Sequence, residues 1–229
     1  MLHTADCHLG THRTPDREED AFARLVDLAI RESVDVVLVT GDLFDHARVP
    51  ESLLDWTADQ LDRIPCPTVL LPGNHDAYHA QSVHRRLDAP SRCREVLLLD
   101  DDQGSTVTVP GVPLVVWGRA MVEHEPKFRP LADIPGRSSD SWCVVAGHGL
   151  VVDGGTHRSS PIQESELDAV DWDYVGLGHC HVYTELRDGP VVARYSGATA
   201  ASRQQEPGAV IVDFVPERGA IARWVALDD

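Results

Sequence analysis

Residues 35–45 read DVVLVTGDLFD and combine an apolar run with two carboxylates. The run from Asp35 to Thr40 has the length of a strand buried on both faces, as in a parallel sheet. Gly41 lets the backbone turn sharply where this strand ends. Asp42 and Asp45 follow the turn, and the ligands of α/β proteins gather outside the carboxyl ends of strands. This stretch therefore predicts a parallel sheet with a polar site at its edge.

The sequence on either side of this stretch alternates strands with helices. Leu2–Ala5 and Pro67–Leu71 are predicted strands. Asp16–Arg31 is a predicted helix with apolar residues along one face, and Pro50 suits the first turn of a second helix. The resulting order β-α-β-α-β implies parallel strands joined by crossover helices.

The second half of the chain is a series of short strand-like runs. They are Glu95–Leu99, Ser105–Val109, Leu114–Trp117, Cys143–Ala146, Tyr174–Leu177, Val191–Tyr195, Ala209–Val215 and Ala220–Val225. Such a series predicts a mixed or antiparallel second sheet. Two sheets packed face to face with helices outside would bury all of these runs. We therefore expect a single α/β domain over residues 1–229.

Acidic, amide or imidazole groups follow an apolar run in five short segments. These are Asp6-Cys7-His8, Gly41-Asp42-Leu43-Phe44-Asp45, Gly73-Asn74-His75-Asp76, Gly147-His148-Gly149 and Gly178-His179-Cys180-His181. Each segment would deliver its polar groups to the carboxyl edge of a sheet. The sequence therefore predicts that the segments converge on one site.

The donor inventory of these segments suits a pair of metal ions. The candidate ligands are Asp6, His8, Asp42, Asn74, His148, His179 and His181. Oxygen and imidazole donors without thiolate favour manganese, iron or zinc over calcium. So many converging ligands overfill one ion and fit two cations that share a carboxylate, as in known phosphatases and nucleases. Taken singly, each segment could equally be a surface turn or a strand end with solvated imidazoles; the prediction depends on all of them together.

The order D-x-H, G-D-x-x-D, G-N-H-D, G-H, G-H-x-H resembles the calcineurin-like metallophosphoesterase superfamily. The resemblance spans Asp6 to His181 and implies a four-layer α/β/β/α sandwich of two mixed sheets flanked by helices. Residues 3–10 (HTADCHLG) and 195–198 (YSGA) look like the DNA double-strand-break repair exonuclease, or SbcD-like, branch of that superfamily.

The resemblance also implies a role for each residue of the site. It assigns Asp6, His8 and His181 to one metal, Asn74, His148 and His179 to the other, and Asp42 to a bridge between them. It gives His75 the stabilisation of the transition state or protonation of the leaving oxygen, with Asp76 orienting His75. Asp45 is expected to hold its loop rather than to bind metal directly.

The composition limits where in the cell the protein is expected and whether it is expected to bind nucleic acid. The net charge of −17 repels nucleic-acid backbones unless a basic patch interrupts it. No apolar stretch has the length of a membrane span, and no basic-then-apolar leader opens the chain, so we expect a cytoplasmic protein. Scattered single cysteines agree with reduced thiols. We expect no domain that caps DNA within these residues.

The sequence thus predicts a phosphoesterase that uses two divalent cations, first of all Mn²⁺, with Fe or Zn as alternatives. The first hypothesis is a nuclease or phosphodiesterase in which a hydroxide held between the metals attacks phosphorus; the resemblance adds DNA as substrate and an SbcC-like ATPase as partner. The second is a phosphatase or phosphodiesterase that acts on a small metabolite or nucleotide. The third is a non-catalytic interaction module, which the complete ligand set disfavours.

Overall fold

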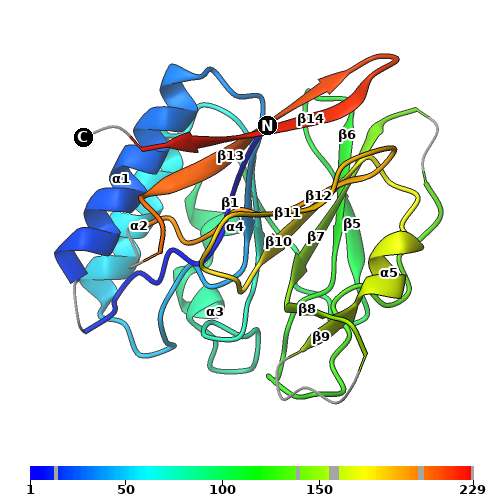
Figure 1. Cartoon of the computed structure of the whole chain (residues 1–229). Coiled ribbons are helices and arrows are strands. Elements are labelled where there is room, and N and C mark those ends of the chain that lie inside the picture. Colours follow the sequence, from blue (N-terminus) through cyan, green and yellow to red (C-terminus); the bar gives the residue numbers. More distant parts are fainter. Residues whose placement is uncertain (13–14, 138–139, 155–159, 201–203, 228–229) are drawn as a thin grey trace.

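The computed structural model describes residues 1–12, 15–137, 140–154, 160–200 and 204–227. Two six-stranded sheets pack face to face, and helices cover the outer face of each (Figure 1). The predicted four-layer α/β/β/α sandwich is therefore confirmed. Within the described residues, no helix is at once long and apolar enough to cross a membrane.

The first sheet has the strand order β14-β13-β1-β2-β3-β4. Its strands are β1 (Leu2–Thr4), β2 (Val37–Thr40), β3 (Thr68–Leu71), β4 (Val96–Leu98), β13 (Gly208–Val215) and β14 (Gly219–Ala226). Strands β1 to β4 are parallel, as the β-α-β-α-β pattern predicts, and the β13–β14 hairpin joins β1 antiparallel. The first sheet is thus mixed.

The second sheet has the order β11-β12-β10-β7-β6-β5. Its strands are β5 (Ser105–Thr108), β6 (Leu114–Gly118), β7 (Trp142–His148), β10 (Tyr174–Gly178), β11 (Thr184–Arg187) and β12 (Val192–Tyr195). Its four central strands are parallel, and β5 and β11 pair antiparallel at the two edges. The second sheet is mixed as well. A small parallel pair, β8 (Leu150–Val152) with β9 (Pro161–Gln163), lies beside it.

Helices α1 (Pro15–Arg31) and α2 (Glu51–Arg63) lie along the outer face of the first sheet, and the short α5 (Glu164–Asp168) lies outside the second (Figure 1). Two more short helices, α3 (Val83–Leu87) and α4 (Ala89–Arg92), connect β3 to β4. No helix was predicted in this connection or at α5, because segments this short carry too few turns for a helical period to show.

Successive apolar side chains of one strand alternate between the two faces of its sheet. In this way the two sheets form three apolar layers. On β2, Val37 and Val39 face the helices, whereas Leu38 lies in the core between the sheets. On β10, Tyr174 lies between the sheets, whereas Val175 packs on the outer face near α5. Side chains of successive strand residues point to opposite faces, so buried central strands read as unbroken apolar runs.

The predicted division of the chain between the sheets is partly wrong. Strands β4, β13 and β14 come from the second half of the sequence, yet they belong to the first sheet. The hairpin turn between β13 and β14 is visible in the sequence because it is local. The pairing of β13 with β1 brings Ile211 opposite Leu2, and no local pattern encodes such a distant partner.

Candidate metal centre

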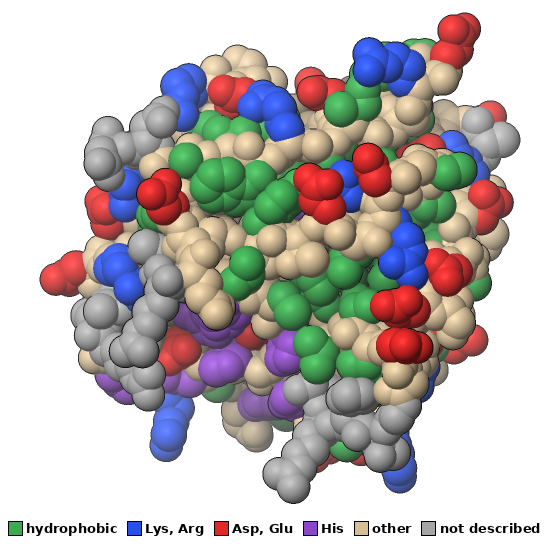
Figure 2. All heavy atoms as spheres, viewed as in Figure 1, with side chains coloured by type: hydrophobic (Ala, Val, Ile, Leu, Met, Phe, Trp, Pro, Cys, Tyr) green, Lys and Arg blue, Asp and Glu red, His purple; other side chains and the backbone are tan. Residues whose placement is uncertain are grey.

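The predicted site residues gather at one end of the sandwich. They follow β1, β2 and β3 of the first sheet and β7 and β10 of the second, so each lies at the carboxyl end of a parallel strand. The carboxyl ends of both sets of strands meet at the lower side of Figure 1, where Figure 2 shows histidines crowded on the surface. The predicted position of the site at the strand ends therefore agrees with the structure.

The loops after β1 and β2 form a rigid pair that carries the carboxylates. Asp6, His8 and Asp42 have φ values of 53°, 50° and 54°, a left-handed conformation uncommon for residues with a side chain. The His8 amide donates to Asp42 O at 3.0 Å, and the next residue, Leu9, donates to Leu43 O at 2.9 Å. Such conformations persist where surrounding contacts enforce them, and they concentrate at functional sites.

Glycines allow the two sheets to approach closely at this end. A Cβ atom on Gly41 would lie 2.1 Å from Nδ1 of His148, and one on Gly178 would lie 2.1 Å from Thr40 O. A Cβ on Gly73 would lie 2.2 Å from Oδ1 of Asp42. Neighbouring backbone and ligand side chains therefore occupy the space that a Cβ would need, and the site forms only because these positions lack one.

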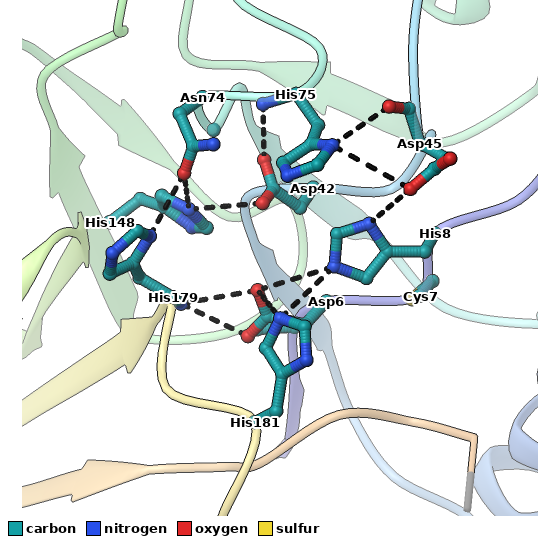
Figure 3. Close-up of polar contacts among 12 residues, drawn as sticks. Asp6, Cys7, His8, Asp42, Asp45, Asn74, His75, His148, His179 and His181 are labelled. Carbon is teal, nitrogen blue, oxygen red and sulfur yellow. Dashed lines mark hydrogen bonds and ion pairs between the residues drawn. The ribbon is translucent and has the colours of Figure 1, made fainter. Parts of the chain in front are cut away.

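One cluster surrounds the buried carboxylate of Asp6 (Figure 3). Its Oδ1 lies 3.9 Å from Nε2 of His8 and 3.6 Å from Nε2 of His181. The two imidazole Nε2 atoms are themselves only 3.2 Å apart. The backbone amide of His179 donates to both carboxylate oxygens, at 3.2 and 3.0 Å, and fixes their orientation.

A second cluster surrounds the side-chain oxygen of Asn74 (Figure 3). This Oδ1 lies 3.1 Å from Nε2 of His148 and 2.9 Å from Nδ1 of His179. Asp42 lies between the clusters: its Oδ2 is 3.3 Å from Nε2 of His148, and it shares a group of converging donor atoms with Asp6. The structure thus brings together every residue predicted as a metal ligand. Their assignment to individual metals stays a prediction.

The donor atoms fit divalent cations. Nδ1 of His148 donates to Thr40 O at 2.9 Å, and Nδ1 of His8 lies 3.1 Å from Oδ1 of Asp45. Each ring therefore turns Nε2 toward the carboxylates, and an outer contact that fixes the tautomer in this way is typical of metal-binding histidines. In the first cluster, the Nε2 atoms of His8 and His181 lie 3.2 Å apart, close enough for both to bind one cation.

Burial sets the charge of these groups in the absence of metal. It raises the pKa of the Asp6 carboxyl to about 7. Burial acts in the same direction on Asp42, but the His148 imidazolium beside it holds the Asp42 pKa below its usual range. Burial lowers the pKa of His179 to about 4 and lowers the pKa of His8 and His181, so these rings are neutral near pH 7. Neutral imidazole is the form that binds a metal. His148 differs: burial lowers its pKa, but the Asp42 carboxylate raises it to about 10, so His148 must lose a proton when a cation binds.

His75 lies at the mouth of the site, with 42% of its side chain exposed. Its amide donates to Oδ1 of Asp42 at 2.8 Å, which ties it to the cluster. Its ring Nδ1 lies 2.8 Å from Asp45 O and 3.6 Å from Oδ1 of Asp45 (Figure 3). Asp45 therefore contacts both His75 and the predicted ligand His8, as expected of a residue that holds the loop.

The predicted role of Asp76 in orienting His75 stays a prediction, and the structure gives its carboxylate other partners. Its carboxylate is buried and accepts hydrogen bonds from the amides of Gly73 at 2.7 Å, Asp42 at 3.3 Å and Phe44 at 3.2 Å. Its Oδ2 also lies 3.0 Å from Nε2 of the buried His84 on α3. Asp76 therefore fixes the two ligand loops to each other, and Asp45, rather than Asp76, contacts the ring of His75.

Two contacts near the site were not predicted from the sequence. The Tyr195 hydroxyl donates to Gly149 O at 2.7 Å and accepts from the Val151 amide at 2.8 Å, which fixes the chain just after His148. His124, in the loop after β6, brings its ring to within 6.1 Å of the His179 ring centre. The resemblance marked residues 195–198 without explaining them, and no sequence pattern links His124 to the site.

Comparisons with known proteins agree with the family that the order of the motifs predicts. A family model described as calcineurin-like phosphoesterase covers residues 1–183. The DNA double-strand break repair protein Mre11 of Saccharolobus solfataricus is 28% identical over 93% of this chain and 60% of its own length. The SbcD component of the nuclease SbcCD of Bacillus subtilis is 26% identical over 98% of this chain and 68% of its own length. The chain therefore spans about 60% of the length of the Mre11 relative.

A solved structure titled as a novel archaeal phosphodiesterase has the same fold. It superposes with a TM-score of 0.52 over 98% of both chains, at 14% sequence identity. At this identity the likeness concerns the fold alone. It agrees with the two mixed sheets and flanking helices described above.

Proposed function

Since the chain belongs to the calcineurin-like phosphoesterase family of metal-dependent phosphoester hydrolases, we propose that it is a phosphodiesterase with two divalent cations and that its substrate is DNA. The observation that carries the proposal is the position of Asp42 between two sets of donor atoms, one around Asp6 and one around Asn74. Asp6, His8 and His181 would hold one cation, and Asn74, His148 and His179 the other.

The cations, when bound, would polarise the phosphate and activate a water molecule. The protein's own residues complete the chemistry. Asp42 and Asp6 supply negative charge in a buried setting, where attraction to a cation is strong. His75 lies at the mouth of the site beside Asp45 and would donate a proton, or a hydrogen bond, to the leaving oxygen. Asp76 and Tyr195 keep the ligand loops in place.

DNA is proposed as substrate because the chain is similar, over nearly its whole length, to a DNA repair protein and to one component of a nuclease. The name of the Bacillus subtilis relative describes one part of a two-part nuclease, which supports a partner for this chain. The SbcC-like ATPase partner, the preference for Mn²⁺ over Fe or Zn, the single domain over residues 1–229 and the cytoplasmic location remain predictions.

The net charge of −17 favours a second candidate, a phosphatase or phosphodiesterase for a small phosphoester. Cleavage assays on protein loaded with manganese discriminate the two. Single-stranded and duplex DNA at low salt are compared with bis-aryl phosphates and nucleotides. DNA degradation supports the first proposal. Robust turnover of small esters without DNA degradation supports the second, and no turnover of any substrate by folded, metal-loaded protein would overturn both.

A further inference from the structure

A cavity of about 540 Å³ opens next to the metal centre, between the loop after β1, the loop after β2 and the start of α2. Its lining includes Gly10, His12, His46, Leu53 and Trp56. It begins two residues after the predicted ligand His8 and one residue after Asp45. The proposed mechanism uses none of these lining residues.

Aromatic rings give the cavity flat apolar walls. The rings of His12 and His46 stack with their centres 5.0 Å apart and their planes 28° apart. Trp56 projects from α2 and contacts Phe22 of α1 at a centroid distance of 6.2 Å, so its ring is held in place by the core. A Cβ on Gly10 would lie 2.6 Å from Cγ1 of Val49, so the absence of a side chain lets this loop close against the α2 end.

One lining residue, His46, also has a buried ring nitrogen without a partner among the described residues. The Arg48 amide donates to Nδ1 of His46 at 3.1 Å, so the neutral His46 ring carries its proton on Nε2. This Nε2 is buried and has no partner among the residues that the structure describes. A buried N–H without an acceptor is costly, and a ligand acceptor would satisfy it. Glu19 and Arg48 add polar groups to the same lining.

We infer that this cavity binds the nucleobase of the substrate, stacked on the rings of Trp56, His12 and His46, with a base acceptor atom on Nε2 of His46. Every base has a flat face, so stacking on aromatic side chains tolerates any sequence. The adjoining Asp45, which contacts His8 and His75, connects the cavity to the centre where the phosphate would lie. This inference rests on the proposed function and adds a site that would hold one base of the substrate beside the scissile phosphate.

The test compares two manganese-dependent substrates with the same leaving group: the p-nitrophenyl ester of thymidine 5′-phosphate and methyl p-nitrophenyl phosphate, which lacks a base. The readout is kcat/KM for the nucleotidyl ester divided by kcat/KM for the methyl ester. A loss of activity that affects both esters equally leaves this ratio unchanged. Wild-type protein should prefer the nucleotidyl ester, mainly through KM. Trp56→Ala should lower the ratio by about 5- to 150-fold, the range for one base stacked on an aromatic ring.

Trp142→Ala is the matched control, because Trp142 is also half-buried but begins β7, at the end of the strand away from the metal centre. It should leave the ratio unchanged. His12→Ala is a second variant in case Trp56→Ala fails to fold, since His12 is exposed, and it should lower the ratio in the same direction. An unchanged ratio in folded Trp56→Ala and His12→Ala, with both esters hydrolysed, would overturn the nucleobase site and leave the phosphodiesterase proposal intact.

If neither ester is hydrolysed, the proposed function fails. The nucleobase site is then tested by thymidine binding alone. Metal-free protein is then titrated with thymidine by calorimetry. Binding that weakens at least fivefold in Trp56→Ala, but not in Trp142→Ala, supports the nucleobase site. Absence of binding to the wild-type protein, or equal affinity in both variants, excludes it.

Discussion

The two sheets contribute differently to the candidate metal centre. The first sheet supplies every carboxylate and the amide, through Asp6, Asp42 and Asn74, whereas the second supplies only imidazoles, through His148, His179 and His181. Positive φ values occur in both halves, at Asp6, His8 and Asp42 in the first and at His179 in the second, but only the first-sheet loops are joined by the buried Asp76. Negative charge thus lies on one side of the site, and imidazoles alone on the other. This difference predicts that the affinity for cations depends mainly on the ligands from the first sheet, which we call the first-sheet half of the centre.

The largest effect is expected for Asp42→Asn, which removes the charge between the clusters. We expect a loss of activity on the order of 10⁴-fold or more, well beyond the 10–100-fold that the hydrogen-bond partners of metal ligands cost. Metal content, measured by elemental analysis after manganese loading, should fall below that of His179→Ala, which removes a neutral ligand from the second sheet.

Asp213→Asn makes the same charge change on an exposed position of β13 and should retain both activity and metal. Wild-type metal content in folded Asp42→Asn would remove Asp42 from the ligand set. Equal metal loss in Asp42→Asn and His179→Ala would contradict the proposed difference between the two halves.

His75→Ala tests a first-sheet residue that lies beside the ligands and is not one of them. Removal of its ring should leave both metals bound and lower the rate roughly 10²–10⁴-fold, the usual range for acid–base assistance. The loss should fall mainly in kcat, because the interaction strengthens as the leaving oxygen gains charge. It should shrink along a series of aryl esters as the leaving group becomes more acidic.

Equal losses across that series would favour charge stabilisation over proton donation. A metal lost in His75→Ala would make His75 a ligand and extend the first-sheet half of the centre.

Asp76→Ala tests the anchor beneath the first-sheet loops. It removes the acceptor of three backbone amides and leaves His84 without its carboxylate partner. Removal of one member of a buried polar pair costs about 3–5 kcal/mol, so urea unfolding of metal-free protein should show a loss of that order. Asp59→Ala, on the exposed face of α2, should change stability by less than about 0.5 kcal/mol. A loss below about 1 kcal/mol in Asp76→Ala would refute the anchoring role.

The smallest effect concerns His3, a histidine of β1 that lies between the sheets and away from solvent. Its Nδ1 is 2.8 Å from the Tyr174 hydroxyl and its Nε2 is 2.9 Å from the Thr40 hydroxyl. Burial lowers the pKa of His3 to about 3, below the value of about 6.5 in the unfolded chain. A depressed folded-state pKa gives stability that is complete above pH 6.5 and is lost as the pH falls toward 3.

His3 should therefore account for a loss of about 2 kcal/mol between neutral pH and pH 5. Urea unfolding of metal-free protein across this range measures the slope. His3→Gln should be less stable at pH 7 and show a flatter slope, and equal slopes in the two proteins would count against the buried neutral state of His3.

Local features of the fold and the site were readable from the sequence, and distant pairings were not. The run from Asp35 to Thr40 predicted a buried strand because both its faces are covered, and Gly41 marked the turn that follows. The placement of β13 beside β1 was not predicted, because the apolar pattern of β13 suits either sheet. The contact of Asp76 with His84 on α3 was not predicted for the same reason: its neighbour in sequence is His75, and His84 is brought to it by the fold.

Two long-range pairings set how late the first sheet and the candidate metal centre can be completed during synthesis. Leu2 pairs with Ile211, so β1 keeps an unpaired edge until β13 has been made. At about 5–20 residues per second, that interval lasts roughly 10–40 s. The imidazoles of His179 and His181 also emerge long after Asp6, which is 173 residues away from His179 in the sequence. The candidate cation site thus cannot be complete before His181 has been made, and a metal would be bound only after that point.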